Sequence, residues 1–218
     1  MCAQYEIEKS MFMKKMDKLV LNISDFDLPK RVLPHTSVPV LVKQDQLRLK
    51  QMNFSLIPWW SKDRKPKFAT HNARIETVLE KPTWKHLFEK KHCLIPITSF
   101  IEPIYEGEYA GNMVQFNLRE CYLIPGLFDS WIDKSSGACI DSFAILTADP
   151  GPFIKGAGHD RSPIFLNQTD IVKWLEIPFS GQNTSLKMLK NTIEPIFSIG
   201  IDRKLKKGWE KRLEKTSN

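Results

Sequence analysis

The second residue of the chain is a cysteine that directly follows the initiator methionine. A small side chain at this position permits removal of Met1, so we expect the mature chain to begin at Cys2. Its free α-amine would have a pKa near ~8 and be partly unprotonated at neutral pH. Such an amine attacks an aldehyde to give a Schiff base, and the thiol of the same residue can then close a five-membered thiazolidine ring. Taken alone, an idle cysteine after the initiator is the ordinary alternative.

A second chemical signal is the segment WWSKDRKPKFATHNAR, residues 59–74. Trp59 and Trp60 could stack on unstacked bases, and the basic side chains that follow could track phosphates of single-stranded nucleic acid. Those basic side chains are Lys62, Arg64, Lys65 and Lys67. The alternative is one tryptophan in the core, the other at the surface, and a solvated loop.

Four further polar residues are scattered along the chain. Arg74 is a fixed cation suited to a phosphate, and Asn72 can donate to an oxygen or a developing oxyanion. Glu102 follows an apolar strand and could act as an acid. His159 lies in a glycine-containing loop, where proton transfer is plausible chemistry. Each of the four, considered singly, has a structural role as its ordinary alternative.

Composition and motifs exclude several classes of protein. The chain has 218 residues and a net charge of +7, and residues 59–92 alone carry +5, whereas residues 93–201 carry −5. Clustered basic charge suits phosphate contacts, although a solvated lysine-rich surface is the alternative. No GxSxG, P-loop or HExxH motif occurs, and the four cysteines have neither CxxC nor zinc spacing. We therefore expect no metal and no cofactor.

The same sequence gives expectations for location and assembly. No apolar run approaches 18 residues, so no membrane span is expected. The start of the chain lacks the apolar core of a secretory signal, and the cysteine usage is that of a reduced compartment. We expect a cytoplasmic protein, and nothing in the sequence demands more than a monomer.

Residue patterns predict one α+β domain over residues 1–218, with a mainly antiparallel β-sheet folded into a barrel-like core and a few short helices. The predicted strands are 38–42, 47–57, 93–101, 113–118, 122–131 and 142–147. A hairpin connection is predicted at 106–111. The predicted helices are 82–91, capped by Thr83, and 168–176 and 183–191. The basic tail at about 202–218 could be a helix or a frayed end.

These pieces occur in an order that resembles the SOS response-associated peptidase (SRAP) family, whose members sense abasic sites in DNA. The resemblance runs from Cys2 to about Phe165. It rests on Met-Cys at the start and on the blocks FSLIPWW, HNARIET, LEKPTW, HCLIPITSFIE, GLFDSW, SFAILTADP and GHDRSPIFL.

The resemblance implies a role for each candidate residue. The Cys2 amine would form a Schiff base with the aldehyde of an abasic site in single-stranded DNA, and its thiol would close the thiazolidine, which shields the lesion. Glu102 would open the deoxyribose ring or shuttle protons, His159 would handle protons at the Schiff base, and Asn72 would hold the site near Cys2. The remaining candidates would contact DNA or line the pocket: Arg74, Trp59, Trp60, Pro34 and Thr147.

The chain departs from the family pattern near its start. Residues 3 and 4 are Ala3 and Gln4, where family members usually carry glycine and arginine. The missing cation could be replaced by Arg31. Pro103 stands where an aromatic residue often follows the family glutamate.

Two other functions are also compatible with the sequence. The family name suggests a thiol peptidase, in which Cys2 is a nucleophile activated by its own amine and removes its own leader. The third hypothesis is a non-covalent binding module for single-stranded nucleic acid, for which the tryptophans and basic blocks alone would suffice.

Overall fold

The structure is a computed structural model that describes residues 2–20, 26–176 and 182–212. Five strands form a closed ring, because β7 pairs with both β6 and β8 while β3 and β4 complete the circuit. All contacts around the ring are antiparallel except β4 with β8. The predicted α+β class with a barrel-like core is confirmed. The five strands are β3 (Ser37–Lys43), β4 (Leu47–Phe54), β6 (His92–Ile104), β7 (Asn112–Ile132) and β8 (Cys139–Ala148).

The barrel is filled by apolar side chains, as the β-branched and aromatic runs of the sequence require. Phe100 of β6 stacks on Phe116 of β7 at 4.9 Å between ring centroids, and Phe54 stacks on Phe143 at 5.4 Å. At Gly126 of β7, an added Cβ would lie 2.6 Å from the carbonyl oxygen of Ala144. Glycine is therefore needed where β7 meets β8 most closely.

Short strands attach to this barrel and carry the chemically interesting residues. β1 (Tyr5–Glu6) pairs with β6 and with β2 (Arg31–Val32). β5 (Asn72–Arg74) runs parallel to β8, and β9 (Ser162–Pro163) runs antiparallel to it. β10 (Phe197–Lys204) extends the sheet along β7. The first residues, the segment around residue 72 and the loop before residue 162 thus meet beside β6 and β8.

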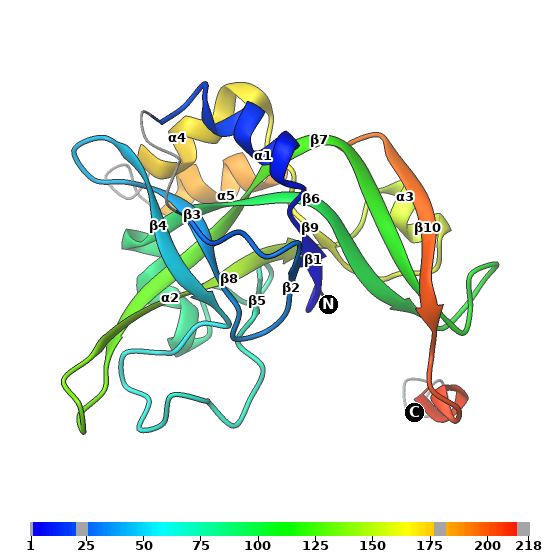
Figure 1. The fold of residues 1–218 in the computed structure, drawn as a ribbon, viewed down its shortest axis with the longest axis horizontal. Coiled ribbons are helices and arrows are strands. Elements are labelled where there is room, and N and C mark those ends of the chain that lie inside the picture. Colours follow the sequence, from blue (N-terminus) through cyan, green and yellow to red (C-terminus); the bar gives the residue numbers. More distant parts are fainter. Residues whose placement is uncertain (1, 21–25, 177–181, 213–218) are drawn as a thin grey trace.

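The helices are short. Figure 1 shows α1, α4 and α5 gathered on one side of the barrel, while the segment between β4 and β5 projects on the opposite side. None of the helices in the described ranges is long and apolar enough to cross a membrane. The helices are α1 (Lys9–Met16), α2 (Pro82–Lys90), α3 (Pro152–Gly156), α4 (Ile171–Glu176) and α5 (Gln182–Lys190), with 3-10 turns η1 (Gln168–Asp170) and η3 (Trp209–Arg212).

Several local predictions need correction. Residues 202–204 belong to strand β10 rather than to a basic helix, because their backbone pairs with β7. The tail beyond 212 lies outside the described residues. Thr83 is not a helix cap: Lys81 occupies that position without a side-chain bond, and Thr83 is buried inside α2. The two strands expected at 113–118 and 122–131 are one continuous strand, β7.

Candidate functional site

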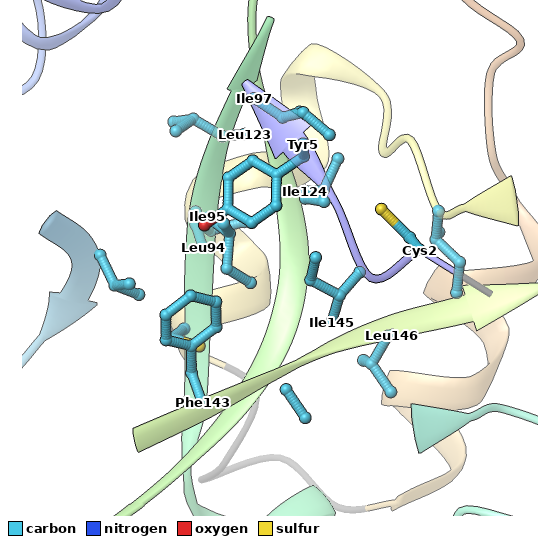
Figure 2. Close-up of a cluster of buried hydrophobic side chains, with 14 of the residues drawn as sticks. Cys2, Tyr5, Leu94, Ile95, Ile97, Leu123, Ile124, Phe143, Ile145 and Leu146 are labelled. Carbon is cyan, nitrogen blue, oxygen red and sulfur yellow. The ribbon is translucent and has the colours of Figure 1, made fainter. Parts of the chain in front are cut away.

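Cys2 lies inside the molecule, at the end of a segment held by main-chain bonds. β1 anchors Tyr5 opposite Phe100 of β6, and the Ile101 amide donates to the Gln4 carbonyl oxygen at 2.9 Å. The Cys2 side chain is almost fully buried. Figure 2 shows it at the edge of a cluster of buried apolar residues, away from Phe143. The start of the chain is therefore built into the core.

Asn72 holds the backbone of Cys2 in place. Strand β5 sets Asn72 beside Ile145 of β8 in parallel register. The Asn72 Nδ2 donates to the Cys2 carbonyl oxygen at 3.1 Å. Its Oδ1 is buried and has no hydrogen-bond partner among the described residues. Because an unpaired buried acceptor is costly, this oxygen is suited to receive a proton donor next to Cys2.

Glu102 and His159 form a buried pair. The His159 Nε2 lies 3.3 Å from the Glu102 Oε2, and both side chains are almost completely shielded from solvent. Glu102 comes from β6, whereas His159 follows α3. Gly158, directly before His159, has a φ of 93°, and an added Cβ would lie 2.3 Å from the Glu106 carbonyl oxygen. Glycine at 158 thus permits the close approach that brings the histidine to β6.

The ring of His159 can be satisfied in two protonation states. Its Nδ1 lies 2.9 Å from the Arg161 carbonyl oxygen and 3.1 Å from the Arg161 amide nitrogen. A neutral ring can accept from that amide while Nε2–H points at Glu102. A protonated ring can instead donate to the carbonyl oxygen. The pair is therefore equipped to take up and release a proton without losing its hydrogen bonds.

The environment keeps the Cys2 thiol protonated. Burial raises the pKa of the thiol well above its ordinary value, and the nearby Glu102 carboxylate raises it further. Because the thiolate is the reactive nucleophile of cysteine, sulfur chemistry here needs a base that accepts the thiol proton during attack. The Glu102–His159 pair is the adjacent group that can do so.

Arg161 supports this site, although the sequence patterns did not single it out. Its guanidinium is buried and makes a bidentate pair with Glu76, at 2.8 and 3.0 Å. It also donates to the Thr147 carbonyl oxygen at 2.8 Å and to Thr147 Oγ1 at 3.3 Å. Thr147 is fully buried, so Arg161 connects the end of β8 to the segment that carries His159. In the sequence, the only indication of this pair was that Arg161 lies two residues after His159 and Glu76 two residues after Arg74.

Exposed aromatic side chains lie on the segment between β4 and β5. Trp59 and Trp60 are both exposed. Trp60 stacks on Phe68, with ring centroids 6.2 Å apart and planes inclined by 22°. Phe68, also exposed, was not a candidate from the sequence. Two anchors fix the segment: Asp129 Oδ2 accepts from the Trp59 amide at 3.1 Å, and Trp131 Nε1 donates to the Ser61 carbonyl oxygen at 2.8 Å.

The other expected cations have distinct surroundings. Arg74, at the end of β5, is exposed and lies level with Thr147 of β8. Arg31 pairs with Glu6 at 2.9 Å and with Asp202 at 2.6 Å, so its charge is locally neutralised. A different cation contacts residue 4: the guanidinium of Arg203 donates to Gln4 Oε1 at 3.4 Å.

Pro34 is half-buried in a tight turn, where the Thr36 amide donates to the Leu33 carbonyl oxygen at 2.9 Å. Within the described ranges, no group of three or more His, Cys, Asp or Glu side chains is arranged to hold a metal. What the structure brings together is thus Cys2, Asn72, Glu102 and His159 in one buried cluster, beside an exposed basic and aromatic segment.

Comparison with solved structures gives the same fold. A crystal structure of a protein from Bacteroides thetaiotaomicron matches with a TM-score of 0.74 at 22% identity, covering 93% of this chain and 92% of that one. A protein from Bordetella bronchiseptica matches with a TM-score of 0.75 at 21% identity, covering 93% and 100%.

Sequence comparison adds relatives with assigned names. The abasic site processing protein YoaM of Bacillus subtilis is 30% identical over 154 residues, covering 68% of this chain and 63% of the relative. The abasic site processing protein HMCES of Mus musculus is 26% identical, covering 76% and 57%. The matches thus span about 60% of the length of these relatives. The sequence model of the SOS response associated peptidase (SRAP) family matches residues 1–201. The chain therefore belongs to the SRAP family.

Proposed function

We propose that this protein processes abasic sites in single-stranded DNA by forming a covalent thiazolidine through Cys2 after removal of Met1. The observation that carries the proposal is the convergence of Cys2 with Asn72, Glu102 and His159 in one buried cluster. The names of the relatives point to the same lesion. The chain would act as a monomer, without metal or cofactor, in the cytoplasm, and would shield the lesion while bound.

The first step is attack by the amine. Glu102 would assist opening of the deoxyribose ring to its aldehyde. The α-amine nitrogen of Cys2 then adds to the aldehyde carbon, and loss of one water gives an imine. The buried Asn72 Oδ1 is the acceptor suited to orient an N–H or O–H at this point. Fixing the Cys2 carbonyl by Asn72 Nδ2 limits the positions the amine can take, which favours reaction through orientation.

The second step is ring closure. The Cys2 sulfur adds to the imine carbon, a C–S bond forms, and the C=N electrons return to nitrogen. The thiol proton passes to the Glu102–His159 pair and from there to nitrogen. The net reaction joins an aldehyde to an amine and a thiol with loss of one water, so no oxidant or reductant is required. Reversal of the same proton transfers would release the DNA.

The protonated thiol bears on the peptidase alternative. A cysteine peptidase depends on a thiolate nucleophile, whereas burial and then Glu102 raise the pKa of the Cys2 thiol. The cluster therefore favours a thiol that reacts second, after the amine. For the third alternative, non-covalent binding, the exposed tryptophans would suffice but the buried cluster would be idle.

A denaturing gel tests the proposal. Protein whose lack of Met1 is verified by intact mass is mixed with a uracil-containing single-stranded oligonucleotide pretreated with uracil glycosylase. We expect a shifted band that Cys2→Ala abolishes. Cys139→Ser is the matched control, because Cys139 is an exposed free thiol outside the cluster. An unshifted wild-type protein would refute the proposal, and loss of the band in both variants would indicate general thiol chemistry.

Borohydride separates the two steps. Cys2→Ala still presents an α-amine once Met1 is removed but cannot close the ring. We therefore expect it to lose the stable crosslink and to keep a crosslink that appears only when borohydride reduces the imine. If the variant gives no product even with borohydride, the amine is not the first nucleophile.

A further inference from the structure

A cavity of about 320 Å³ lies beside the exposed aromatic segment and is separate from the Cys2 cluster. Its volume falls in the range of sites for small ligands or parts of ligands. Exposed cationic or titratable side chains form one part of its lining, and buried or half-buried residues of β4 and the turn after it form the other. The lining residues are His35, Asn53, Ser55, Ile57, Arg64 and Lys65.

Two basic side chains, Arg64 and Lys65, line this cavity. Neither Arg64 nor Lys65 makes an ion pair in the part of the chain that the structure describes. The polar groups of Ser55 and Asn53 have no side-chain hydrogen bond there either. Two cations, a hydroxyl and an amide thus face one space, and this set of donors suits an oxyanion such as a phosphate.

The backbone of the cavity is strained at two points. Among described residues other than glycine, only His35 and Ser55 have positive φ, 73° and 86°. His35 is the third residue of the turn at Leu33–Thr36, a position at which positive φ strongly favours glycine. Strained residues that persist in a fold are concentrated at functional sites. Both strained residues line the same cavity.

The cavity is linked to the Cys2 cluster through His71. The His71 ring lies beside Phe54, with centroids 6.0 Å apart. Burial lowers the pKa of His71, and His71 also senses the charges of both Glu102 and His35. His71 directly precedes Asn72, the residue that contacts Cys2, and Phe54 lies in the chain between the lining residues Asn53 and Ser55.

We propose that this cavity is a phosphate subsite, which binds a phosphodiester of the DNA strand next to the abasic site through His35, Arg64 and Lys65. This inference rests on the proposed function. The ligand class is a nucleic-acid phosphodiester. The imidazole of His35 adds a feature that the two fixed cations lack, since it gains a charge when it binds the anion.

Titration of His35 gives the subsite a signature. Burial, Lys65 and Arg64 lower the pKa of His35 in the unliganded protein, and a phosphate at the cavity would raise it by opposing those charges. Binding of DNA therefore takes up a proton, so affinity should rise as the pH falls from about 7.5 to 5.5. His71 is the other titratable group coupled to His35, and Arg64 and Lys65 are the basic side chains that act on it.

The experiment measures non-covalent binding of an unmodified oligothymidylate to the mature full-length chain at several salt concentrations and pH values. In single-stranded DNA one lost phosphate contact flattens the salt slope by about 0.7, which is roughly fivefold in affinity at 0.1 M salt. We expect this change or more in Arg64→Gln/Lys65→Gln. The matched control is Lys62→Gln/Lys67→Gln, which removes equal charge from the same segment outside the cavity lining and should lose less. We expect His35→Gly to remove most of the pH dependence.

The outcomes are distinct. Equal losses in the two double variants, or an unchanged pH dependence in His35→Gly, would overturn the subsite. Crosslinking to an abasic oligonucleotide is followed in parallel: if wild-type protein forms no crosslink, the proposed function fails, whereas a normal crosslink with equal double variants refutes only the subsite.

Discussion

Glu76→Gln tests whether the Glu76 carboxylate stabilises the buried Arg161 side chain. The Arg161 side chain is only 7% exposed, and its guanidinium donates to the two carboxylate oxygens of Glu76 at 2.8 and 3.0 Å. Glutamine keeps one of these hydrogen bonds and removes the other together with the negative charge. A hydrogen bond to a charged group contributes about 1.5–3 kcal/mol, so we expect unfolding free energy to fall by about 2 kcal/mol. For a chain of this size that lowers Tm by roughly 4–8 °C.

The matched control is Asp149→Asn. Asp149 also contacts Arg161, at 3.0 Å, but its side chain is 89% exposed, against 42% for Glu76. An exposed ion pair contributes about 0–1 kcal/mol, so this variant should unfold almost like wild type. Both are measured by thermal and urea unfolding at pH 7. Equal effects of the two variants, or a Glu76→Gln loss below about 0.5 kcal/mol, would show that the buried guanidinium does not depend on Glu76.

The pH dependence provides an independent check. Burial alone would raise the pKa of Glu76, but its hydrogen bonds with Arg161 outweigh that effect and lower it. A carboxyl with a lowered pKa stabilises the fold above its ordinary pKa, about 4.3, and this contribution is lost as the pH falls through the lowered value. The stability difference between wild type and Glu76→Gln should therefore begin to shrink as the pH falls below about 4.3, where the unfolded carboxyl takes up a proton, and should vanish below the lowered pKa of the folded carboxyl.

Three further predictions follow from the same structure. His35→Gly relieves a positive φ of 73° and should raise stability by about 1 kcal/mol in thermal unfolding, while a lower Tm would mean that the imidazole itself stabilises the turn. The crosslinking rate should fall about tenfold per pH unit below the amine pKa of ~8, and a rate independent of pH between about 5 and 8 would exclude the amine as the limiting nucleophile. In the folded protein, iodoacetamide should label exposed Cys139 first, because burial raises the pKa of Cys121 to about 12; equal labelling of both, read by peptide mass, would contradict this burial.

The strands of the barrel could be predicted from the sequence because their signal is local. Alternation and β-branched runs marked β3, β4, β6 and β8 to within a few residues, and the hairpin at 106–111 fell between β6 and β7. The two-residue strands were missed, since a pair such as Tyr5–Glu6 or Ser162–Pro163 carries no periodic pattern. Their pairing is set by neighbouring strands, which is tertiary information.

Helix α1 and strand β10 show the converse. α1 has the sequence KSMFMKKM, in which Phe12 and Met16 are buried and lysines cover the other face. Its eight residues give a weak helical pattern, and its start is fixed by Glu8, which accepts bonds from the Ser10 and Met11 amides. In β10, lysines and arginine suggested a helix, but main-chain pairing with β7 decided the outcome.

The candidate cluster depends on contacts between residues far apart in the chain. The members of the cluster are separated by 30 or more residues at each step along the chain: Cys2, Asn72, Glu102 and His159. No rule of residue spacing could therefore predict that they meet. The prediction came from the order of the sequence blocks shared with the family. Arg161 and Glu76 could not be identified from the sequence, because their ion pair forms only when β5 and the His159 loop pack against β8. The Glu102–His159 side-chain pair lies close to the protonated thiol of Cys2, and this arrangement determines which form of the thiol is stable there. A thiolate there would be repelled by the Glu102 carboxylate, so a thiol that yields its proton only during attack is the form of Cys2 that suits this buried space.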